Sequence, residues 1–460
     1  MKLWTKIYND LKKHPHQTIE DGDVKMTYAD FLNKAIDFST KIVGEKCCAI
    51  YCDSEIYAAI AIVGCIAAGV TALPLSKRYG KTHCEKILKA ISPSSVVSDI
   101  YGGLDIIRIS DSSYISPDVH PTLIMCTSGT TGMPKGIMLS EDNILSNVTD
   151  IEDYFKICEE DSILIARPLY HCAVLTGEFL VSIAKGVRIV FYSNSFVLVS
   201  IEKIIERESI TTFCATPTII KLIANFAKNE IKNRLKNIVI SGECLGAIDG
   251  RIIRNALPNV KIYHVYGLTE ASPRVCYLPP EYFADAPDYV GIPLKSVKVE
   301  IRNDKGEPVN VNDRGLLWVF GPNVTIGYYN DQNLTKKYMS DGWLCTGDIA
   351  QYNERGWIKI LGRYDNLIVR AGMNIYPSEI ENELKKDERV RDVYIYTIDD
   401  PKMGIQIGMK IAGDFNNIKE IKKLCTDLLP LYQVPAKVEL YESLPRNGSG
   451  KILRKVITDD

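Results

Sequence analysis

The chain has 460 residues, a formal net charge of −2 and a hydrophobic fraction of 46%. This length predicts more than one domain, and the hydrophobic fraction supplies enough apolar side chains for packed cores. The near-neutral charge does not provide the clustered basic face that nucleic-acid binding usually requires, so no nucleic-acid partner is expected.

Apolar strand-like runs alternate with longer helical stretches over the first 265 residues, which predicts α/β architecture. The expected strands are 47–51, 70–75, 95–97, 162–166, 187–192, 211–215, 237–241 and 261–265. The expected helices are 29–43, 54–68, 83–91, 141–156, 173–185, 198–208 and 217–227. This part of the chain is therefore predicted to form layers of sheet and helix.

One early segment is uncharged over residues 56–75 and is long enough to span a bilayer. It is rich in alanine and is interrupted by Gly64, Gly69 and Pro74. We predict a buried helix that ends near Gly69, followed by a strand, and no transmembrane segment.

Short β-type runs at 297–301, 315–320 and 357–360 dominate after residue 287 and predict a β-rich subdomain. Beyond it, we expect a helix at 377–386, a strand at 393–397 and a helix at 418–428. The predicted organisation is an N-terminal domain of residues 1–364 and a small α+β C-terminal domain of residues 365–460.

The thirteen cysteines are scattered and form no Cys-x-x-Cys pair and no Cys/His group with metal-ligand spacing. The first residues, Met-Lys-Leu-Trp-Thr-Lys, lack the hydrophobic region of a signal peptide. We therefore expect free cysteines in a reducing compartment and a cytoplasmic location.

The most informative run is Cys-Thr-Ser-Gly-Thr-Thr-Gly-Met-Pro-Lys-Gly at residues 126–136, which follows an apolar strand-like segment. Its glycines allow a close backbone approach to an anion, and its hydroxyls and lysine supply donors. The run fits neither the Walker A pattern nor the Rossmann pattern. Without other signals, a plain surface loop would be the better explanation of this run.

Five further motifs follow this run along the chain. They are Ser241-Gly242-Glu243, Tyr266-Gly267-Leu268-Thr269-Glu270, Thr346-Gly347-Asp348, Gly362-Arg363-Tyr364-Asp365 and Pro445-Arg446-Asn447-Gly448-Ser449-Gly450-Lys451. In this order they resemble the signatures of the AMP-forming adenylating enzymes, which include acyl- and aryl-CoA synthetases, peptide-synthetase adenylation domains and luciferases. The motifs are most similar to those of acyl-CoA synthetases. The resemblance implies a large domain of layered α/β subdomains with a β-rich subdomain, and a small mobile C-terminal domain.

The resemblance also implies a nucleotide site for ATP. Its residues would be Thr127, Ser128, Gly129, Thr130, Thr131, Gly132, Lys135, Gly242, Glu243, Tyr266, Gly267, Asp348 and Arg363. Thr269 would bind the α-phosphate, and Glu270 would hold Mg²⁺, which prefers oxygen ligands. Asp348 would accept both ribose hydroxyls. Without the other motifs, a helix cap at Thr269 and a turn aspartate at Asp348 would be equally reasonable.

The C-terminal motifs imply the moving parts of such an enzyme. By resemblance, Lys451 is the catalytic lysine between the substrate carboxylate and the α-phosphate, and Asp365 is the hinge residue. Gly372 would line the tunnel for the thiol arm, although Ala371 stands where many relatives have a second glycine. On composition alone, Lys451 would be an ordinary surface lysine.

Two positions bear on the acid. The stretch Pro168-Leu169-Tyr170-His171 is similar to acyl- and aryl-CoA ligases, in which the histidine neighbours the substrate carboxylate, and it lacks the aspartate of amino-acid-activating domains. Arg274 follows the glutamate motif where the resemblance places the acyl pocket. We hypothesise that Arg274 pairs with a second carboxylate or polar tail; the alternatives are an arginine turned to solvent or paired with a neighbouring acid.

The predicted activity is an ATP- and Mg²⁺-dependent ligation of a carboxylic acid to a thiol through an acyl-adenylate, with CoA as the expected acceptor. The alternative acceptor is the phosphopantetheine arm of a separate carrier protein acting in trans, because no part of the chain resembles a carrier domain. A non-catalytic nucleotide-binding homologue would lack the lysine, the glutamate or the ribose aspartate. Lys451, Glu270 and Asp348 are all present.

Overall fold

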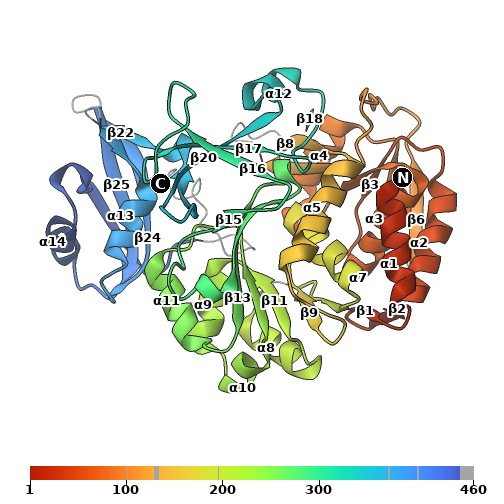
Figure 1. Ribbon diagram of the computed structural model, residues 1–460, viewed down its shortest axis with the longest axis horizontal. Coiled ribbons are helices and arrows are strands. Elements are labelled where there is room, and N and C mark those ends of the chain that lie inside the picture. Colours follow the sequence, from red (N-terminus) through yellow and green to blue (C-terminus); the bar gives the residue numbers. More distant parts are fainter. Residues whose placement is uncertain (101, 129–133, 195, 371–372, 401–403, 446–460) are drawn as a thin grey trace.

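The computed structural model describes residues 1–100, 102–128, 134–194, 196–370, 373–400 and 404–445. Two large sheets form the α/β part of the chain, which confirms the predicted fold class (Figure 1). The seven-stranded sheet has the order β18 (Gly327–Tyr328), β8 (Pro134–Leu139), β7 (Leu123–Ser128), β4 (Thr71–Pro74), β3 (Cys47–Ile50), β5 (Ser95–Ile100), β6 (Gly103–Arg108). The nine-stranded sheet has the order β15 (Ile292–Pro293), β14 (Arg274–Leu278), β13 (Lys261–Gly267), β12 (Asn237–Ile240), β11 (Thr212–Ala215), β9 (Ser162–Ile165), β10 (Arg188–Phe191), β1 (Thr18–Asp21), β2 (Val24–Thr27).

Successive side chains of a strand point to opposite faces of its sheet, and both faces are covered by helices. In β9, Ile163 and Ile165 join the central core, whereas Leu164 faces a second core on the opposite side of the sheet. This is the period-two pattern of a strand that is buried on both faces. The helices whose buried faces join the central core include α1 (Lys2–Lys13), α2 (Tyr28–Ile42), α3 (Glu55–Ala68) and α5 (Glu141–Tyr154).

The outer faces of the two sheets are also covered. Helix α4 (Lys81–Ile91) packs on the seven-stranded sheet. The nine-stranded sheet is covered by α8 (Leu198–Arg207), α9 (Pro217–Phe226), α10 (Asn229–Arg234) and α11 (Ala247–Ala256). The carboxyl ends of the parallel strands β11, β12 and β13 therefore emerge at one edge, where ligands of α/β sheets commonly bind.

The uncharged segment at 56–75 folds as predicted. Helix α3 ends at Gly69, which takes the left-handed conformation with φ of 69°, and β4 follows directly. Glycine suits this position because it has no Cβ to clash. In the described part of the chain, no helix combines the length and the apolar character needed to cross a membrane.

The helix predicted at 173–185 is interrupted. The structure has α6 (Cys172–Val174), a π-helical turn (Leu175–Leu180) and α7 (Val181–Lys185). The hydroxyl of Thr176 donates to the carbonyl oxygens of Cys172 and Ser272, at 2.8 and 2.9 Å. These contacts tie the turn to the segment before β14, and π-helical turns of this kind are frequent at functional sites.

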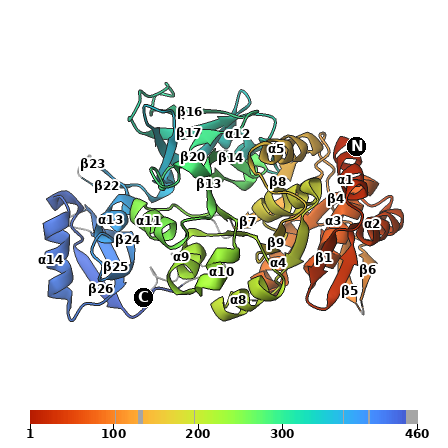
Figure 2. The same ribbon diagram turned by 60° about the horizontal axis from the view of Figure 1, so that its bottom comes forward.

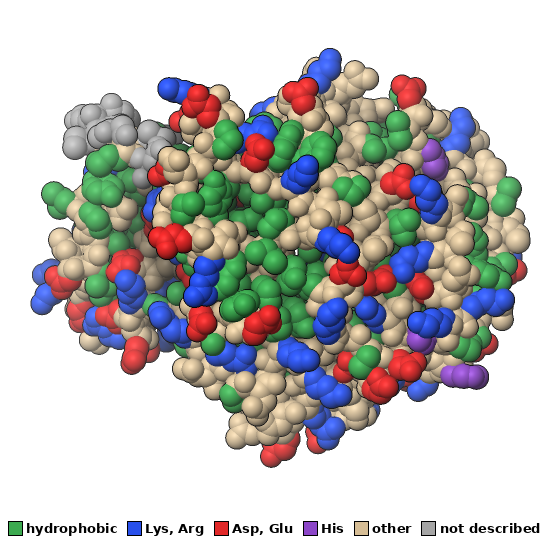
Figure 3. Space-filling model, in the orientation of Figure 1, with side chains coloured by type: hydrophobic (Ala, Val, Ile, Leu, Met, Phe, Trp, Pro, Cys, Tyr) green, Lys and Arg blue, Asp and Glu red, His purple; other side chains and the backbone are tan. Residues whose placement is uncertain are grey.

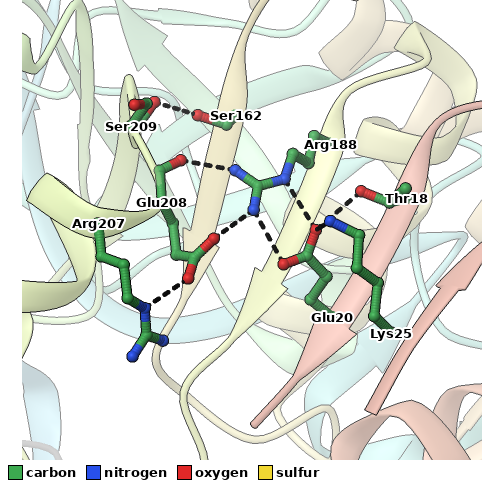
Figure 4. Close-up of polar contacts among 8 residues, drawn as sticks. All are labelled: Thr18, Glu20, Lys25, Ser162, Arg188, Arg207, Glu208 and Ser209. Atoms are coloured by element: carbon green, nitrogen blue, oxygen red, sulfur yellow. Dashed lines mark hydrogen bonds and ion pairs between the residues drawn. The ribbon is translucent and has the colours of Figure 1, made fainter. Parts of the chain in front are cut away.

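An ion-pair network joins the N-terminal hairpin to the sheet (Figure 4). Arg188 on β10 donates to both carboxylate oxygens of Glu20 on β1, each at 2.9 Å. It also donates to the backbone oxygen of Glu208, the residue that ends α8, at 2.6 Å. Burial alone would raise the pKa of Glu20, but the hydrogen bonds from Arg188 and Lys25 lower it to about 2. The network therefore contributes to the stability of the hairpin's attachment.

The β-rich part beyond residue 287 forms a separate sheet, which stands apart from the two large sheets in Figure 2. Its elements are β16 (Lys298–Arg302), β17 (Gly315–Phe320), β19 (Met339–Ser340), β20 (Trp343–Tyr352) and β21 (Ile358–Arg363), with α12 (Gln332–Tyr338) beside them. Its central strand β20 carries the Thr346-Gly347-Asp348 motif.

A small α+β unit with its own hydrophobic core follows, at the left of Figure 1. It contains β22 (Ile368–Arg370), β23 (Met373–Ile375), α13 (Pro377–Leu384), β24 (Val390–Asp400), β25 (Gly404–Gly413), α14 (Ile418–Leu428) and β26 (Lys437–Tyr441). Arg314 and Glu379 form an ion pair of 2.6 Å across its junction with the rest of the chain. The domain division at 364/365 stays a prediction.

Candidate active site

The site is built around the chain reversal between β13 and β14. At Gly267 a Cβ atom would lie 1.9 Å from the carbonyl oxygen of Pro273, so only glycine fits. A short 3₁₀ turn, Thr269–Ala271, then carries Thr269 and Glu270 beyond the end of β13. Figure 3 shows that this face of the molecule is hollowed near its middle, where hydrophobic side chains gather over the region of β13 and β15.

Glu270 is held from two sides. Its Oε1 accepts a hydrogen bond of 3.0 Å from the hydroxyl of Tyr328 on β18, and its backbone oxygen accepts one of 2.8 Å from Thr325. Burial raises the pKa of the Glu270 carboxyl, while the nearby charges of Arg363 and Lys135 oppose that rise. A bound cation would favour the ionised form, so this carboxylate fits a Mg²⁺ ligand.

Asp348 lies at the meeting point of β13, β20 and β21. Its Oδ2 accepts a hydrogen bond from the hydroxyl of Tyr266, and its Oδ1 lies 3.5 Å from Nη1 of Arg363. Nη1 of Arg363 also donates to the backbone oxygen of Thr346, at 2.8 Å. Burial raises the pKa of the Asp348 carboxyl, and the charge of Arg363 opposes that rise. A buried carboxylate with acceptor capacity left over suits hydroxyl donors such as those of a ribose.

Gly347 makes this arrangement possible. It has φ of +72°, and a Cβ there would lie 2.8 Å from Nη2 of Arg363. Any side chain at this position would therefore strain the backbone and displace the guanidinium.

The predicted phosphate loop includes the end of β7 and the start of β8, which pair as antiparallel strands. Thr127 pairs with Lys135 across the two strands, so Lys135 belongs to β8. Its Nζ lies 5.6 Å from the ring centre of Tyr338. Gly129, Thr130, Thr131 and Gly132 lie outside the described residues, and the side chain of Ser128 is not described either.

Gly242 and Glu243 follow the carboxyl end of β12. Gly242 has φ of +91°, and Oε2 of Glu243 accepts a hydrogen bond of 2.9 Å from the hydroxyl of Thr218 on α9. No hydrogen bond or ion pair described for Glu243 reaches Asp348 or Glu270. Glu243 is thus hydrogen-bonded to helix α9. The residues that do act on one another at the site are Tyr266, Glu270, Asp348, Arg363 and Lys135.

His171 caps the start of α6. Its backbone oxygen accepts hydrogen bonds from Val174 and Leu175, and its ring lies 4.0 Å from that of Tyr170 between centroids. The segment before it is anchored by Glu55, whose Oε2 accepts a hydrogen bond of 2.9 Å from the backbone N–H of Leu169. Burial raises the pKa of Glu55 to about 7.

Arg274 begins β14 and is only 2% exposed, which excludes an arginine turned to solvent. Among the described residues it forms no ion pair; the acid on which its charge acts is Glu178, whose carboxylate pairs with Arg167. Its backbone is fixed by Asn147, which donates to its carbonyl oxygen at 2.8 Å and accepts from its N–H at 3.1 Å. The guanidinium is therefore buried, and the backbone that carries it is held by Asn147.

Of the remaining predicted residues, the structure describes Asp365 but not Lys451 or Gly372. Asp365 lies in a 3₁₀ turn, Tyr364–Asn366, with its Oδ2 3.6 Å from Nη2 of Arg363. Lys451 and Gly372 lie outside the described residues. All thirteen cysteines are free thiols, and the described part of the chain holds no group of three or more His, Cys, Asp or Glu side chains arranged to bind a metal ion.

Several contacts of this site escaped the sequence analysis. Tyr328 reaches Glu270 from 58 residues away, and Tyr266 reaches Asp348 from 82 residues away. The buried ion pair of Arg167 and Glu178 carries no local motif. The alternation of apolar and polar residues around these side chains could have indicated that they lie near a core. It could not have shown which residue each of them contacts.

Comparison with known proteins shows the family of the chain. Residues 110–329 match the model of the AMP-binding enzyme family. Feruloyl-CoA synthase of an Amycolatopsis species is 31% identical over 339 residues, which cover 72% of this chain and 68% of that protein. Oxalate–CoA ligase of Arabidopsis thaliana is 28% identical over 403 residues, which cover 84% of this chain and 78% of that protein.

A solved structure extends the likeness to almost the whole chain. The complex of o-succinylbenzoate CoA synthetase from Bacillus subtilis with its acyl-adenylate intermediate OSB-AMP has a TM-score of 0.84 at 24% identity. The match covers 99% of this chain and 98% of that one, so the two proteins share one fold. The chain belongs to the AMP-binding enzyme family, as an acid–thiol ligase of the AMP-forming type.

Proposed function

We propose that the protein joins a carboxylic acid to CoA in two half-reactions. In the first, a carboxylate oxygen forms a bond to the α-phosphorus of ATP, the bond to the bridging oxygen breaks, and pyrophosphate leaves. In the second, the CoA sulfur, having lost its proton to solvent, forms a bond to the carbonyl carbon, and AMP leaves. The products are acyl-CoA, AMP and pyrophosphate.

The observation that carries this proposal is the convergence of Glu270, Asp348, Tyr266 and Arg363 from four strands and turns at one edge of the fold. Phosphoryl transfer depends on positioning and on charge neutralisation more than on covalent help from the protein. Two buried carboxylates beside two cationic groups, Arg363 and Lys135, suit a metal-bound, negatively charged nucleotide.

Each predicted residue receives a proposed role in ATP binding. Glu270 holds Mg²⁺, which supplies charge neutralisation at the phosphates when bound. Asp348 and Arg363 bind the ribose, and the Tyr266 ring covers the adenine while its hydroxyl orients Asp348. The hairpin from Thr127 to Lys135 holds the β- and γ-phosphates, and Thr269 holds the α-phosphate. Gly242 and Glu243 complete the nucleotide site.

Further residues are proposed to act on the reacting carboxylate, the domain movement and the thiol. His171 lies beside the reacting carboxylate, and Lys451 neutralises charge between that carboxylate and the α-phosphate. Asp365 is proposed as the hinge about which the C-terminal part of the chain turns between the half-reactions. Gly372 lines the path of the thiol arm. We also propose a cytoplasmic location, supported by the thirteen free cysteines, which a reducing compartment maintains.

The relatives do not name the acid, because feruloyl-CoA synthase and oxalate–CoA ligase are named for chemically different acids. We propose that Arg274, buried just after the Glu270 turn, lies in the acyl pocket. The acid is therefore to be identified from the chemistry of that pocket.

The test is pyrophosphate release from ATP and Mg²⁺ across a panel of fatty, aryl, dicarboxylic and amino acids, each with and without CoA. Mass spectrometry would identify the product, and acyl-CoA is expected. An adenylate that forms but does not move to CoA would make a carrier protein in trans the acceptor. Absence of pyrophosphate with every acid would contradict the proposed activity.

A further inference from the structure

A buried polar group lies between β14 and the π-helical turn. We call it the Arg274 cluster, and it consists of Arg167, Glu178, Ser272 and Arg274. Glu178 is 1% exposed, and its Oε1 lies 2.5 Å from Nη2 of Arg167. The charge of Arg274 also acts on this carboxylate, although the two form no ion pair in the described part of the chain. Two guanidinium groups therefore share one carboxylate, which leaves one buried positive charge without a counterion in the described part of the chain.

The cluster also contains unused hydrogen-bonding atoms. Nε of Arg167, Oε2 of Glu178, Oγ of Ser272 and Nε of Arg274 are buried, and none has a hydrogen-bond partner among the described residues. Buried polar atoms in folded proteins almost always have partners, and an unpaired buried charge is especially costly. Several such atoms in one place indicate a site that a polar ligand completes.

The cluster is connected to the reacting end of the site. Arg274 follows Glu270 by four positions in the chain. Between them, the backbone oxygen of Ser272 accepts a hydrogen bond from the hydroxyl of Thr176 in the π-helical turn. The buried Cys172 thiol, next to His171, lies within electrostatic reach of both Glu270 and Arg274. An acid whose reacting carboxylate lies near Glu270 would thus extend its other end toward Arg274.

The guanidinium of Arg274 is packed against neighbouring groups. Its Nη2 would be 3.3 Å from a Cβ built on Gly177, so the guanidinium packs directly against the backbone of the π-helical turn. On another side it lies beside the hydroxyl of Tyr154, a fully buried tyrosine of α5. A long alkyl chain would have to displace these groups and would leave the guanidinium desolvated against hydrocarbon.

We propose, on the basis of the proposed ligase function, that the substrate is a short dicarboxylic acid whose second carboxylate pairs with Arg274. Arginine presents a planar fork of donors that matches a carboxylate. The second carboxylate supplies the missing counterion and acceptors for the donors that have no partner. The Arg167–Glu178 pair positions Arg274 by holding the carboxylate beside it.

The experiment compares acids of equal chain length that differ only at the far end: succinate with butyrate, and glutarate with pentanoate. The readout is kcat/KM for pyrophosphate release at saturating ATP and Mg²⁺. We expect the dicarboxylate to be preferred by about 100-fold or more, because a buried cation left unpaired by the methyl-terminated acid is costly. Equal use of the two members of each pair would overturn the inference while leaving the ligase function intact.

Arg274→Met tests the residue itself. The variant should lose most of its dicarboxylate activity and gain activity with the methyl-terminated acid, with the KM for ATP changed less than about twofold. Arg274→Lys should keep part of the preference. The matched control is Arg207→Met, which removes an exposed arginine from α8 and should leave the ratio unchanged. An unchanged ratio in Arg274→Met would contradict the inference.

A binding measurement separates this inference from the activity. Succinate or glutarate, added with AMP, should raise the melting temperature of the unaltered protein but not that of Arg274→Met. An equal rise in both proteins would also overturn the inference. Failure of every acid to release pyrophosphate would overturn the proposed ligase function and, with it, this substrate class.

Discussion

The hydroxyl of Tyr266 donates a hydrogen bond to Oδ2 of Asp348, joining the end of β13 to the central strand of the β-rich sheet. The two residues are 82 positions apart and belong to different sheets. This bond joins the α/β part of the chain to the β-rich part at the proposed nucleotide site. It also leaves the other oxygen of Asp348 near Arg363.

Tyr266→Phe should weaken ATP binding. The change removes a hydrogen bond to a buried carboxylate, worth about 1.5 kcal/mol, so the KM for ATP should rise roughly 10-fold. The measurement is pyrophosphate release as a function of ATP concentration. Tyr277→Phe, on the neighbouring strand β14, is the control and should leave the KM for ATP unchanged. A KM unchanged in Tyr266→Phe would show that the hydroxyl does not support nucleotide binding.

Gly347→Ala should lose both stability and ATP affinity. Gly356→Ala provides a matched control, because Gly356 also has φ of +72° but a Cβ added there would meet nothing within 4 Å. Both variants should lose about 1 kcal/mol in the free energy of unfolding from backbone strain. Only Gly347→Ala displaces Arg363, so only it should raise the KM for ATP. Equal KM values in both would contradict the role of Arg363.

Lys451→Ala should separate the two half-reactions. Pyrophosphate release should fall by about 10²- to 10³-fold, because a charge that neutralises the reacting phosphate is lost. Formation of acyl-CoA from a supplied acyl-adenylate should be retained, and product analysis by mass spectrometry checks both steps. Equal loss of the two steps would contradict the proposed role.

Glu55→Gln should change how stability depends on pH. Burial raises the pKa of Glu55 to about 7, above the value of about 4.3 in an unfolded chain, so the folded state binds this proton more tightly. The unfolding free energy of the unaltered protein therefore falls by about 2–3 kcal/mol from this group between pH 5 and pH 8. Glutamine does not titrate but still accepts the Leu169 hydrogen bond, so the variant should lack this fall.

Denaturant unfolding at the two pH values measures the difference. Glu354→Gln, at an exposed position, should leave the pH dependence of the unaltered protein in place. The same fall in Glu55→Gln and in the unaltered protein would rule out Glu55 as its source.

Glu20→Gln should change the pH dependence of stability in the acidic range, where Glu20 makes the unaltered protein less stable as the pH falls. The pKa of Glu20 is lowered to about 2, so its stabilising contribution is complete above about pH 4.3 and is lost as the pH falls toward 2. After allowance for solvent screening, this amounts to roughly 0.5–1 kcal/mol between pH 5 and pH 3.5. The variant should be less stable at pH 5 and should lose less on acidification, as measured by thermal unfolding. A parallel loss in both proteins would contradict the network's contribution.

Much of the layered fold could be predicted from the chain alone, because its signals are local. The apolar run at 162–166 and the glycine after 54–68 are local signals, and β9 and α3 appear where these signals predict them. The segment 173–185 shows where local reasoning ends. Its helical pattern is real, but the contacts of Thr176 with the distant Ser272 accompany a π-helical turn that periodicity does not reveal.

The amino-acid sequence by itself determined which residue types are available at the site. The reason is that each motif, at Thr269–Glu270, Thr346–Asp348 and Arg363, is a short continuous stretch of the chain. Only the tertiary structure decided which groups face each other. The pairing of Tyr266 with Asp348, the hydrogen bond from Tyr328 to Glu270 and the burial of Arg274 are products of strand order and packing. Burial and partner charges depend on distance in space, so they have no signature in sequence spacing.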